Sequence, residues 1–136
     1  MERTIVIGHG HFATGLQSAL ELIMGIQKNI EFIDFDRNMS IDDLRSKIKT
    51  ITLDENTTVF VDLFAGSPFN VIVDEILHGA NTRLFYGITL GMLMEYVSKL
   101  SFDIKLSDEE IVDIGKNQVG KFILTNYFQN DSVDEL

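Results

Sequence analysis

The chain has 136 residues, and its content of 45% hydrophobic and 24% charged residues is typical of a soluble globular domain rather than a disordered or fibrous protein. It has no cysteine, which excludes disulfide bonds and thiolate nucleophiles, and no stretch approaches the roughly 18 apolar residues of a membrane span. A formal net charge of -10 argues against nucleic acid or anionic lipid as a ligand and favours a basic protein partner. We expect one domain at residues 1–128 and a polar acidic tail at 129–136.

Strands and helices are predicted to alternate through the first half of the chain. A β-branched apolar run ends at Gly8, and apolar residues then recur at helical spacing up to Gly25. Ser40 and Asp43 resemble a capping box at the start of the second helix. In order, we predict a strand at residues 4–7, a helix at 12–24, a strand at 30–35, a helix from 41, and a strand at 57–63.

The second half continues the alternation. Ser67 is predicted as a helix N-cap with Pro68 as the first helical residue, and Ser107 with Glu110 as a further capping box. The predicted elements are a helix from 68, a strand at 83–88, a helix at about 91–100 and a helix from 108 to about 118. Residues 120–125 follow a helix without a strong break but are rich in β-formers, so we predict a strand there.

This order of elements predicts an α/β fold with a doubly wound, mainly parallel sheet of about four strands and helices on both faces. In such folds ligands bind beyond the carboxyl ends of the strands. The functional site should therefore combine the segments 8–12 and 62–70, which follow the first and third strands.

The first of these segments carries two imidazoles, His9 and His11, between glycines at a strand-to-helix turn. Glycines let the backbone approach a ligand closely, and the N–H groups of a helix N-terminus favour an anion such as a phosphoryl group. Histidine has an ordinary pKa of about 6.5, so a neutral, nucleophilic ring is available near pH 7. His9 is a candidate for covalent phosphorylation, and His11 is more simply interpreted as a helix-entry residue.

The second segment offers a carboxylate and a hydroxyl. Asp62, at the end of the third strand, could hold one imidazole nitrogen as N–H and orient the other for attack. Ser67 stands at a second helix N-terminus that could receive an anion. On spacing alone, Asp62 could equally be a solvated carboxylate at a strand end, and Ser67 is more simply interpreted as a helix cap.

These residues resemble a known family. The segments IVIGHGHFA (5–13) and VDLFAGSPFN (61–70) are similar to the IIA component of the mannose/fructose/sorbose class of bacterial phosphotransferase systems. The resemblance covers nearly the whole chain, and the Gly-Ser-Pro-Phe-Asn run after the aspartate is its specific signature. The His-Gly pair alone would be a weak signal.

The resemblance implies a histidine phosphocarrier that accepts a phosphoryl group from HPr on His9 and donates it to the IIB component. It implies that Asp62 orients the imidazole and that Ser67 lies near the phosphoryl group with the loop glycines Gly10 and Gly66. It further implies a cytoplasmic homodimer that exchanges an antiparallel C-terminal strand, associates with the membrane IIC and IID subunits through IIB, and needs no metal or other cofactor.

The sequence departs from the family pattern at two places. A second histidine stands at position 11, which makes His11 a secondary candidate for the phosphorylated residue. The turn before Ser67 reads Ala65-Gly66 where many relatives carry paired glycines.

Other classes of protein share parts of this pattern. A dinucleotide-binding domain would use Gly8, Gly10 and Asp34, although Ala13 stands where the third glycine of that motif is usual. A metal-dependent hydrolase would use His9, His11 and Asp62 as ligands, but no general base is evident.

A receiver domain phosphorylated on Asp62 would need an acidic pair after the first strand, which is missing. The phosphocarrier subunit of dihydroxyacetone kinase is closer in chemistry, but the Ser-Pro-Phe-Asn run favours the sugar system. A non-enzymatic binding module would leave the joint placement of His9, Asp62 and Ser67 unexplained.

Overall fold

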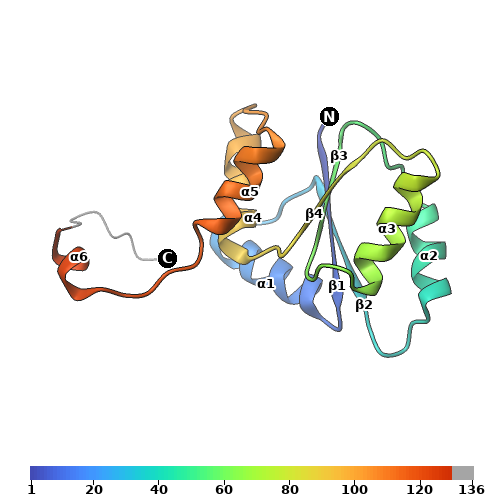
Figure 1. Cartoon of the computed structure of the whole chain (residues 1–136), viewed down its shortest axis with the longest axis horizontal. Coiled ribbons are helices and arrows are strands. Elements are labelled where there is room, and N and C mark those ends of the chain that lie inside the picture. Colours follow the sequence, from blue (N-terminus) through green and yellow to red (C-terminus); the bar gives the residue numbers. More distant parts are fainter. Residues whose placement is uncertain (130–136) are drawn as a thin grey trace.

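The computed structural model describes residues 1–129, so the tail predicted at 129–136 lies, after its first residue, outside the described residues. Strands and helices alternate up to the last helices of the described chain (Figure 1). The strands are β1 (Arg3–His9), β2 (Ile30–Phe35), β3 (Thr57–Val61) and β4 (Arg83–Tyr86). The helices are α1 (Phe12–Met24), α2 (Ile41–Lys49), α3 (Ser67–Leu77), α4 (Leu90–Ser101), α5 (Asp108–Lys116) and α6 (Leu124–Gln129).

The four strands form one parallel sheet in the order β2-β1-β3-β4, which confirms the predicted α/β class. The chain turns to one side after β1 and to the other side after β3, so the loops that follow these two strands diverge. The point where such loops diverge, at the carboxyl ends of the strands, is the usual ligand position in doubly wound sheets.

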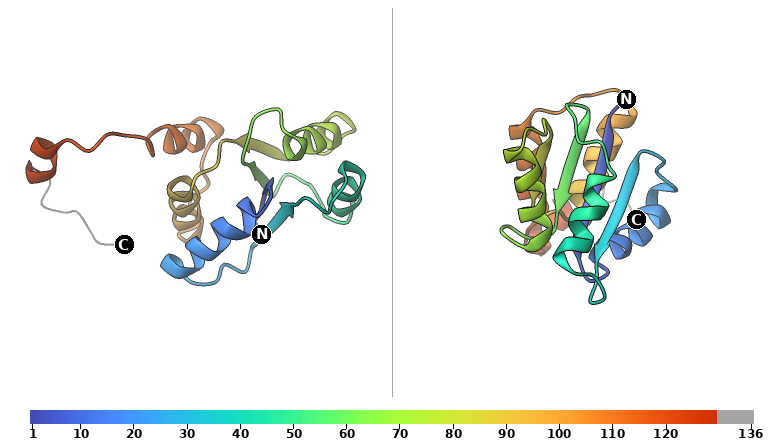
Figure 2. Two further views of the ribbon diagram at one scale, coloured as in Figure 1. Left: turned by 90° about the horizontal axis from the view of Figure 1, so that it is seen from below. Right: turned by 90° about the vertical axis from the view of Figure 1, so that its right-hand side faces the viewer.

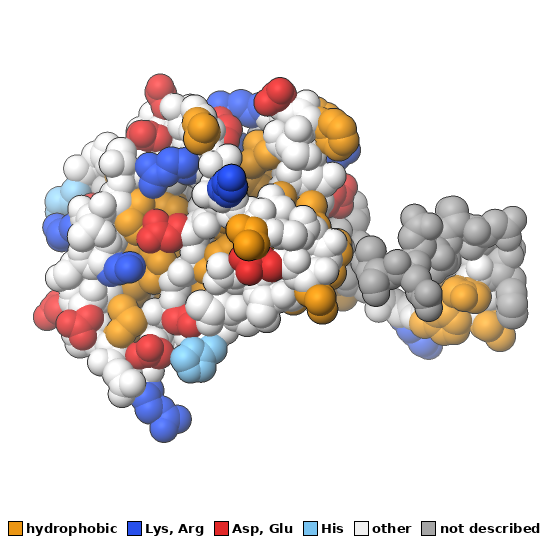
Figure 3. Space-filling model, turned by 180° about the vertical axis from the view of Figure 1, so that it is seen from behind, with side chains coloured by type: hydrophobic (Ala, Val, Ile, Leu, Met, Phe, Trp, Pro, Cys, Tyr) orange, Lys and Arg blue, Asp and Glu red, His pale blue; other side chains and the backbone are white. Residues whose placement is uncertain are grey.

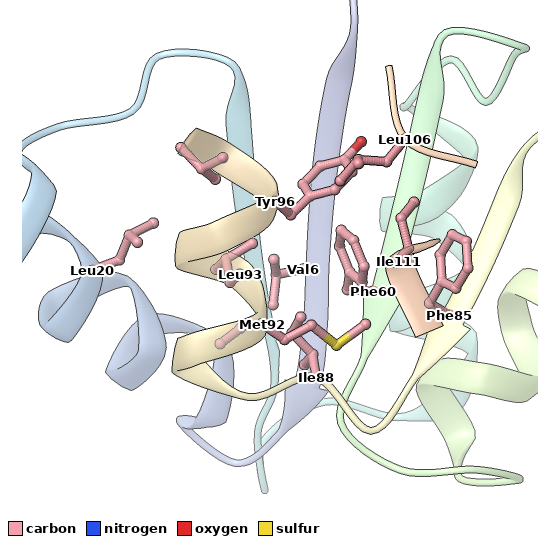
Figure 4. Packing of buried hydrophobic residues seen from close by; sticks show 12 residues of the cluster. Val6, Leu20, Phe60, Phe85, Ile88, Met92, Leu93, Tyr96, Leu106 and Ile111 are labelled. Atoms are coloured by element: carbon pink, nitrogen blue, oxygen red, sulfur yellow. The ribbon is translucent and has the colours of Figure 1, made fainter. Parts of the chain in front are cut away.

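Helices cover both faces of the sheet, because successive side chains of each strand point to opposite faces (Figures 1 and 2). On one face, Val6 and Phe60 pack with residues of α1, α4 and α5, and the Tyr96 ring meets Phe60 edge-on at 5.0 Å (Figure 4). On the other face, Ile5 and Ile7 pack against α2 and α3. Packing on both faces therefore fixes the strands, and with them the positions of their carboxyl ends.

The helix starts follow local capping chemistry. Both predicted capping boxes are present: Asp43 N–H donates to Ser40 Oγ at 3.0 Å, and Ser107 and Glu110 form the second box. The prediction at Ser67 was wrong by one residue, because Gly66 is the N-cap of α3 and Ser67 its first helical residue. Extended backbone at the glycine supplies the cap geometry, and proline still fits inside the first turn.

The strand predicted at residues 120–125 is absent from the single chain. Residues 119–123 are irregular and α6 begins at Leu124. A strand exists only where a neighbouring strand satisfies its backbone groups, and this segment runs away from the sheet (Figures 1 and 2). Within residues 1–129, its β-forming residues therefore have no partner strand.

The C-terminal segment exposes a set of hydrophobic side chains. They stand apart from the body of the molecule in the space-filling view (Figure 3). The set is Val119, Phe122, Ile123, Leu124 and Tyr127. None of the helices in residues 1–129 is long and apolar enough to cross a membrane.

Candidate functional site

The fold brings two predicted site residues together from distant parts of the sequence. His9 is the last residue of β1, and Asp62 directly follows β3. These strands are neighbours in the sheet, with Ile7 opposite Val61. The imidazole and the carboxylate therefore meet at the carboxyl ends of β1 and β3.

Two hydrogen bonds join His9 to one oxygen of Asp62. The His9 backbone N–H donates to Asp62 Oδ2 at 2.9 Å, and His9 Nδ1 lies 2.8 Å from the same oxygen. An ionised carboxylate can only accept, so this contact assigns the ring proton to Nδ1 and leaves Nε2 with a free lone pair. The Asp62 side chain is 13% exposed and that of His9 is 42% exposed, so the buried acid holds an accessible ring.

The imidazole is confined from two directions. The Phe35 ring lies edge-on to it with centroids 6.0 Å apart. On another side, a Cβ added at Gly66 would lie 2.6 Å from His9 Cε1 and 3.2 Å from Nε2. Any side chain at position 66 would push the ring away from Asp62, which explains why the chain has glycine there. Phe35 gave no signal as a site residue in the sequence, because it reads as an ordinary strand position.

The N-terminus of α3 lies beside Nε2 and offers hydrogen-bond donors. The N–H groups of Ser67 and Phe69 belong to the first turn and have no intrahelical acceptor. The Ser67 hydroxyl has no hydrogen-bond partner within residues 1–129. Groups of this kind can bind an anion, and here they lie next to His9 Nε2.

The turn before α3 adopts a conformation that favours glycine, although alanine occupies it. Ala65 has φ 62°, in the left-handed region, at a cost of roughly 1–2 kcal/mol for a residue with a Cβ. The Asn70 side chain donates to the Ala65 carbonyl at 3.1 Å and holds this turn. The turn thus takes a left-handed backbone conformation with alanine where many relatives carry glycine.

Gly10 turns the chain away from His9. Its φ of 58° is left-handed, and its N–H donates to the Phe35 carbonyl at 2.8 Å. This bond ties the loop after β1 to the end of β2. The two imidazoles nevertheless contact different carboxylates, His9 that of Asp62 and His11 that of Asp34.

His11 pairs with a carboxylate of its own. Its Nδ1 lies 3.2 Å from Asp34 Oδ2, and its side chain is 82% exposed. Asp34 also accepts the Thr14 backbone N–H at 3.0 Å and the Thr14 hydroxyl, so it caps α1 from β2. His11, the N-cap residue of α1, makes no capping hydrogen bond itself. Its position as a helix-entry residue agrees with the simpler of the two interpretations.

The pKa of Asp34 lies below its ordinary value. Partial burial acts to raise this pKa, but the two hydrogen bonds from Thr14 and the interaction with His11 lower it by more. A carboxyl with a lowered pKa stabilises the fold at pH values above its unfolded pKa, and this contribution is lost as pH falls through the folded pKa.

Asp34→Ala is expected to lower the free energy of unfolding by about 1–2 kcal/mol at pH 7, because it removes the cap of α1. The difference from the unsubstituted protein should shrink as pH falls below the unfolded pKa of about 4 and then through the lower folded pKa. Urea unfolding at pH 7 and pH 3 measures both values. Glu31→Ala, an exposed acid on the same strand, serves as the control, and an equal loss at both pH values would contradict the assignment.

The geometry weakens the competing classes. A dinucleotide-binding site would need the Asp34 carboxylate for a ribose, but Thr14 and His11 already occupy it. A metal site would need both histidines to converge, whereas they pair with different acids. Within residues 1–129, no three or more His, Cys, Asp or Glu side chains gather closely enough to hold a metal.

Comparison with known proteins finds IIA components of the phosphotransferase system. The family model described as the fructose IIA component of the phosphotransferase system matches residues 3–112. The chain is 31% identical over 94 residues to the sorbose-specific EIIA component of Lacticaseibacillus casei, covering 67% of this chain and 68% of that protein. It is 28% identical over 102 residues to the fructose-specific EIIA component of Bacillus subtilis (strain 168), covering 72% and 70%.

The solved structures agree with the sequence comparisons. The phosphotransferase system component EIIA from Streptococcus agalactiae resembles this fold with a TM-score of 0.75 and 30% identity. The match covers 89% of this chain and 97% of that one. The family-model match at residues 3–112 includes both segments that contribute to the site.

Proposed function

This chain belongs to the mannose-class IIA family of the sugar phosphotransferase system, and we propose on that basis that His9 is its phosphorylated residue. In this proposal His9 accepts a phosphoryl group from phosphorylated HPr and passes it to the IIB component. Residues 1–128 constitute the IIA domain. The protein acts in the cytoplasm and reaches the membrane IIC and IID subunits through IIB, so the transported sugar never contacts this chain.

The observation that carries the proposal is the contact of His9 Nδ1 with Asp62 Oδ2 at 2.8 Å. With its proton held on Nδ1, the ring attacks phosphorus through the Nε2 lone pair. The P–N bond to the donor histidine breaks, and its electron pair returns to the donor ring. The product ring keeps its Nδ1 proton and becomes cationic, and Asp62 stabilises that charge.

The phosphoryl oxygens need donors because their negative charge spreads during transfer. In this proposal the hydroxyl of Ser67 and the N–H groups at the start of α3 supply them, which the closeness of Gly66 to the His9 ring supports. Gly66 and Gly10 leave space for the phosphoryl group and the approaching partner. No metal or other cofactor enters this reaction.

The experiment that tests the function is incubation with phosphoenolpyruvate, enzyme I and HPr, followed by intact mass measurement. One acid-labile phosphoryl group per chain is the expected result, because phosphohistidine is labile in acid. Transfer of that group to IIB would establish the second step. If carriers that phosphorylate a known IIA leave this protein unmodified, the proposed function is wrong.

Gly66→Ala is expected to slow phosphorylation by about tenfold or more, because the new methyl group displaces the ring from Asp62. The fold should tolerate the change, since the backbone of Gly66 has φ -78°. Gly15→Ala is the matched control, because a Cβ there meets no atom within 4 Å. Single-turnover rates of both variants check the prediction, and equal rates would contradict it.

We further propose that the protein is a homodimer in which the C-terminal segment packs on the second copy. The exposed hydrophobic side chains of this segment support the proposal, because large apolar surfaces on soluble proteins mark interfaces. Sedimentation velocity should show a species of twice the chain mass. A single species at the mass of one chain would overturn the dimer.

A further inference from the structure

We propose that the guanidinium of Arg37 pairs with the phosphoryl group as it is transferred at His9. This inference rests on the proposed function and assigns a further residue to the same reaction. It arises from the distribution of charge around the site and from the position of the loop between β2 and α2.

The carboxyl edge of the sheet has a single cationic side chain in its loops. Four loops follow the strands, at residues 10–11, 36–40, 62–66 and 87–89. Arg37 is the one Lys or Arg that they contain, whereas Asp36 and Asp62 lie in the same loops and Asp34 lies just before them. A dianionic group entering this edge therefore meets several acids and one base.

The backbone holds Arg37 close to His9. Phe35 is the register partner of His9, and paired strands lie about 4.8 Å apart. The bond from the Gly10 N–H to the Phe35 carbonyl continues this pairing past the strand end. Arg37 follows two residues later, within about 7 Å along the chain.

Both residues open onto one hollow. Its walls are formed by His9, Gly10 and His11 on one side and by residues 35–39, including Arg37, on the other. His9 thus borders the α3 N-terminus through Gly66 and this hollow through Phe35. A phosphoryl group at Nε2 would have helix donors on one side and a guanidinium within reach on the other.

Arg37 is exposed and has no hydrogen bond or ion pair within residues 1–129. Its neighbour Asp36 is already engaged, since it accepts the Asn38 backbone N–H at 2.9 Å. By contrast, Arg45 and Arg83 are each paired with an aspartate. The donors of Arg37 are therefore available to a ligand.

The chemistry of the reaction calls for such a group. A phosphoryl group carries a charge of about -1.5 to -2 near pH 7, and the nearby carboxylates repel it. A planar guanidinium can bind two phosphoryl oxygens at once and offset this repulsion. Arg37 supplies the positive charge, while the α3 N-terminus supplies neutral donors.

Two phosphoryl donors separate contact with the phosphoryl group from attraction of a protein partner. Phosphorylated HPr brings a protein surface, whereas phosphoramidate is a small donor that loses ammonia as the Nε2–P bond forms. Arg37→Gln is expected to slow labelling of His9 by about tenfold with both donors, and Arg37→Lys by less. Lys28→Gln is the charge-matched control, because Lys28 is an exposed cation at the opposite end of the sheet.

The labelling rates of Arg37→Gln with the two donors decide whether Arg37 contacts the phosphoryl group. Unchanged labelling of Arg37→Gln by phosphoramidate, with slower labelling by HPr that disappears at high salt, would overturn it in favour of partner attraction. Unchanged labelling by both donors would also overturn it. Matching thermal unfolding curves exclude a folding defect in the variant. If the unsubstituted protein accepts no phosphoryl group from either donor, the proposed function fails and this inference falls with it.

Discussion

His9→Gln is expected to abolish phosphorylation by HPr completely, whereas His11→Gln should be labelled at nearly the unsubstituted rate. Glutamine keeps a polar side chain but has no nucleophilic nitrogen, so no phosphoramidate bond can form. His11 lies on the other side of the Gly10 turn and pairs with Asp34, so its ring is not held by Asp62. Intact mass after incubation with the upstream carriers measures both variants.

The two histidines make each variant the control for the other. Both substitutions remove one imidazole from the same loop, and only one of them removes the ring bound to Asp62. Loss of labelling confined to His11→Gln would keep the function and move the site by two residues. Loss in both variants would indicate that the loop itself had been disturbed, which amide spectra of each variant would reveal.

Asp62→Asn is expected to lower the single-turnover rate of phosphoryl transfer by about 10² to 10⁴. The amide resembles the carboxylate in shape, but it carries no charge to hold the proton on Nδ1 or to stabilise the cationic product. Asp62 is a positioning residue, so the saturating rate should fall far more than the affinity for the donor. Rapid-quench measurements over a range of donor concentrations separate these two quantities.

Asp36→Asn is the matched control for charge. It removes one negative charge from the neighbouring loop without touching the His9 ring, and should not slow the transfer. If both substitutions slow the transfer equally, then the net charge of the edge matters and the orientation of the ring does not. Rates measured at high salt also separate the two effects, because salt screens the effect of net charge but not the orientation of the ring by Asp62.

Local chemistry determined most of the fold in advance. Apolar periodicity predicted α1 and β2 with the bounds that they have, and the capping boxes at Ser40 and Ser107 marked two helix starts. Such signals depend on a few neighbouring residues and on backbone preferences that act before any tertiary contact. The alternation of elements then implied the parallel sheet, because crossovers between parallel strands follow one hand.

The meeting of His9 and Asp62 was also predictable. Residues at the carboxyl ends of adjacent parallel strands converge, so their spacing of 53 positions in the sequence did not hide the pair. What they do as a pair stays a prediction until the variants are measured. The ends of the third and fourth strands were each predicted two residues too late, since β3 ends at Val61 and β4 at Tyr86.

Contacts between distant segments were decided only by the tertiary structure. Asp34 caps α1 across 20 positions, Phe35 walls the imidazole, and Arg37 shares a hollow with His9. Each of these residues looks ordinary in its own segment, because its role depends on what the fold places beside it.

The C-terminal segment shows the difference between local preference and tertiary contact. Residues 120–125 have the composition of a strand, yet the described residues 1–129 offer no neighbouring strand for them. The sequence by itself determined the elements, the parallel sheet and the edge where the site lies, since these follow from local preference and chain connectivity. Only the tertiary structure decided which side chains confine the imidazole and whether residues 120–125 form a strand, because hydrogen bonds and packing need a second surface.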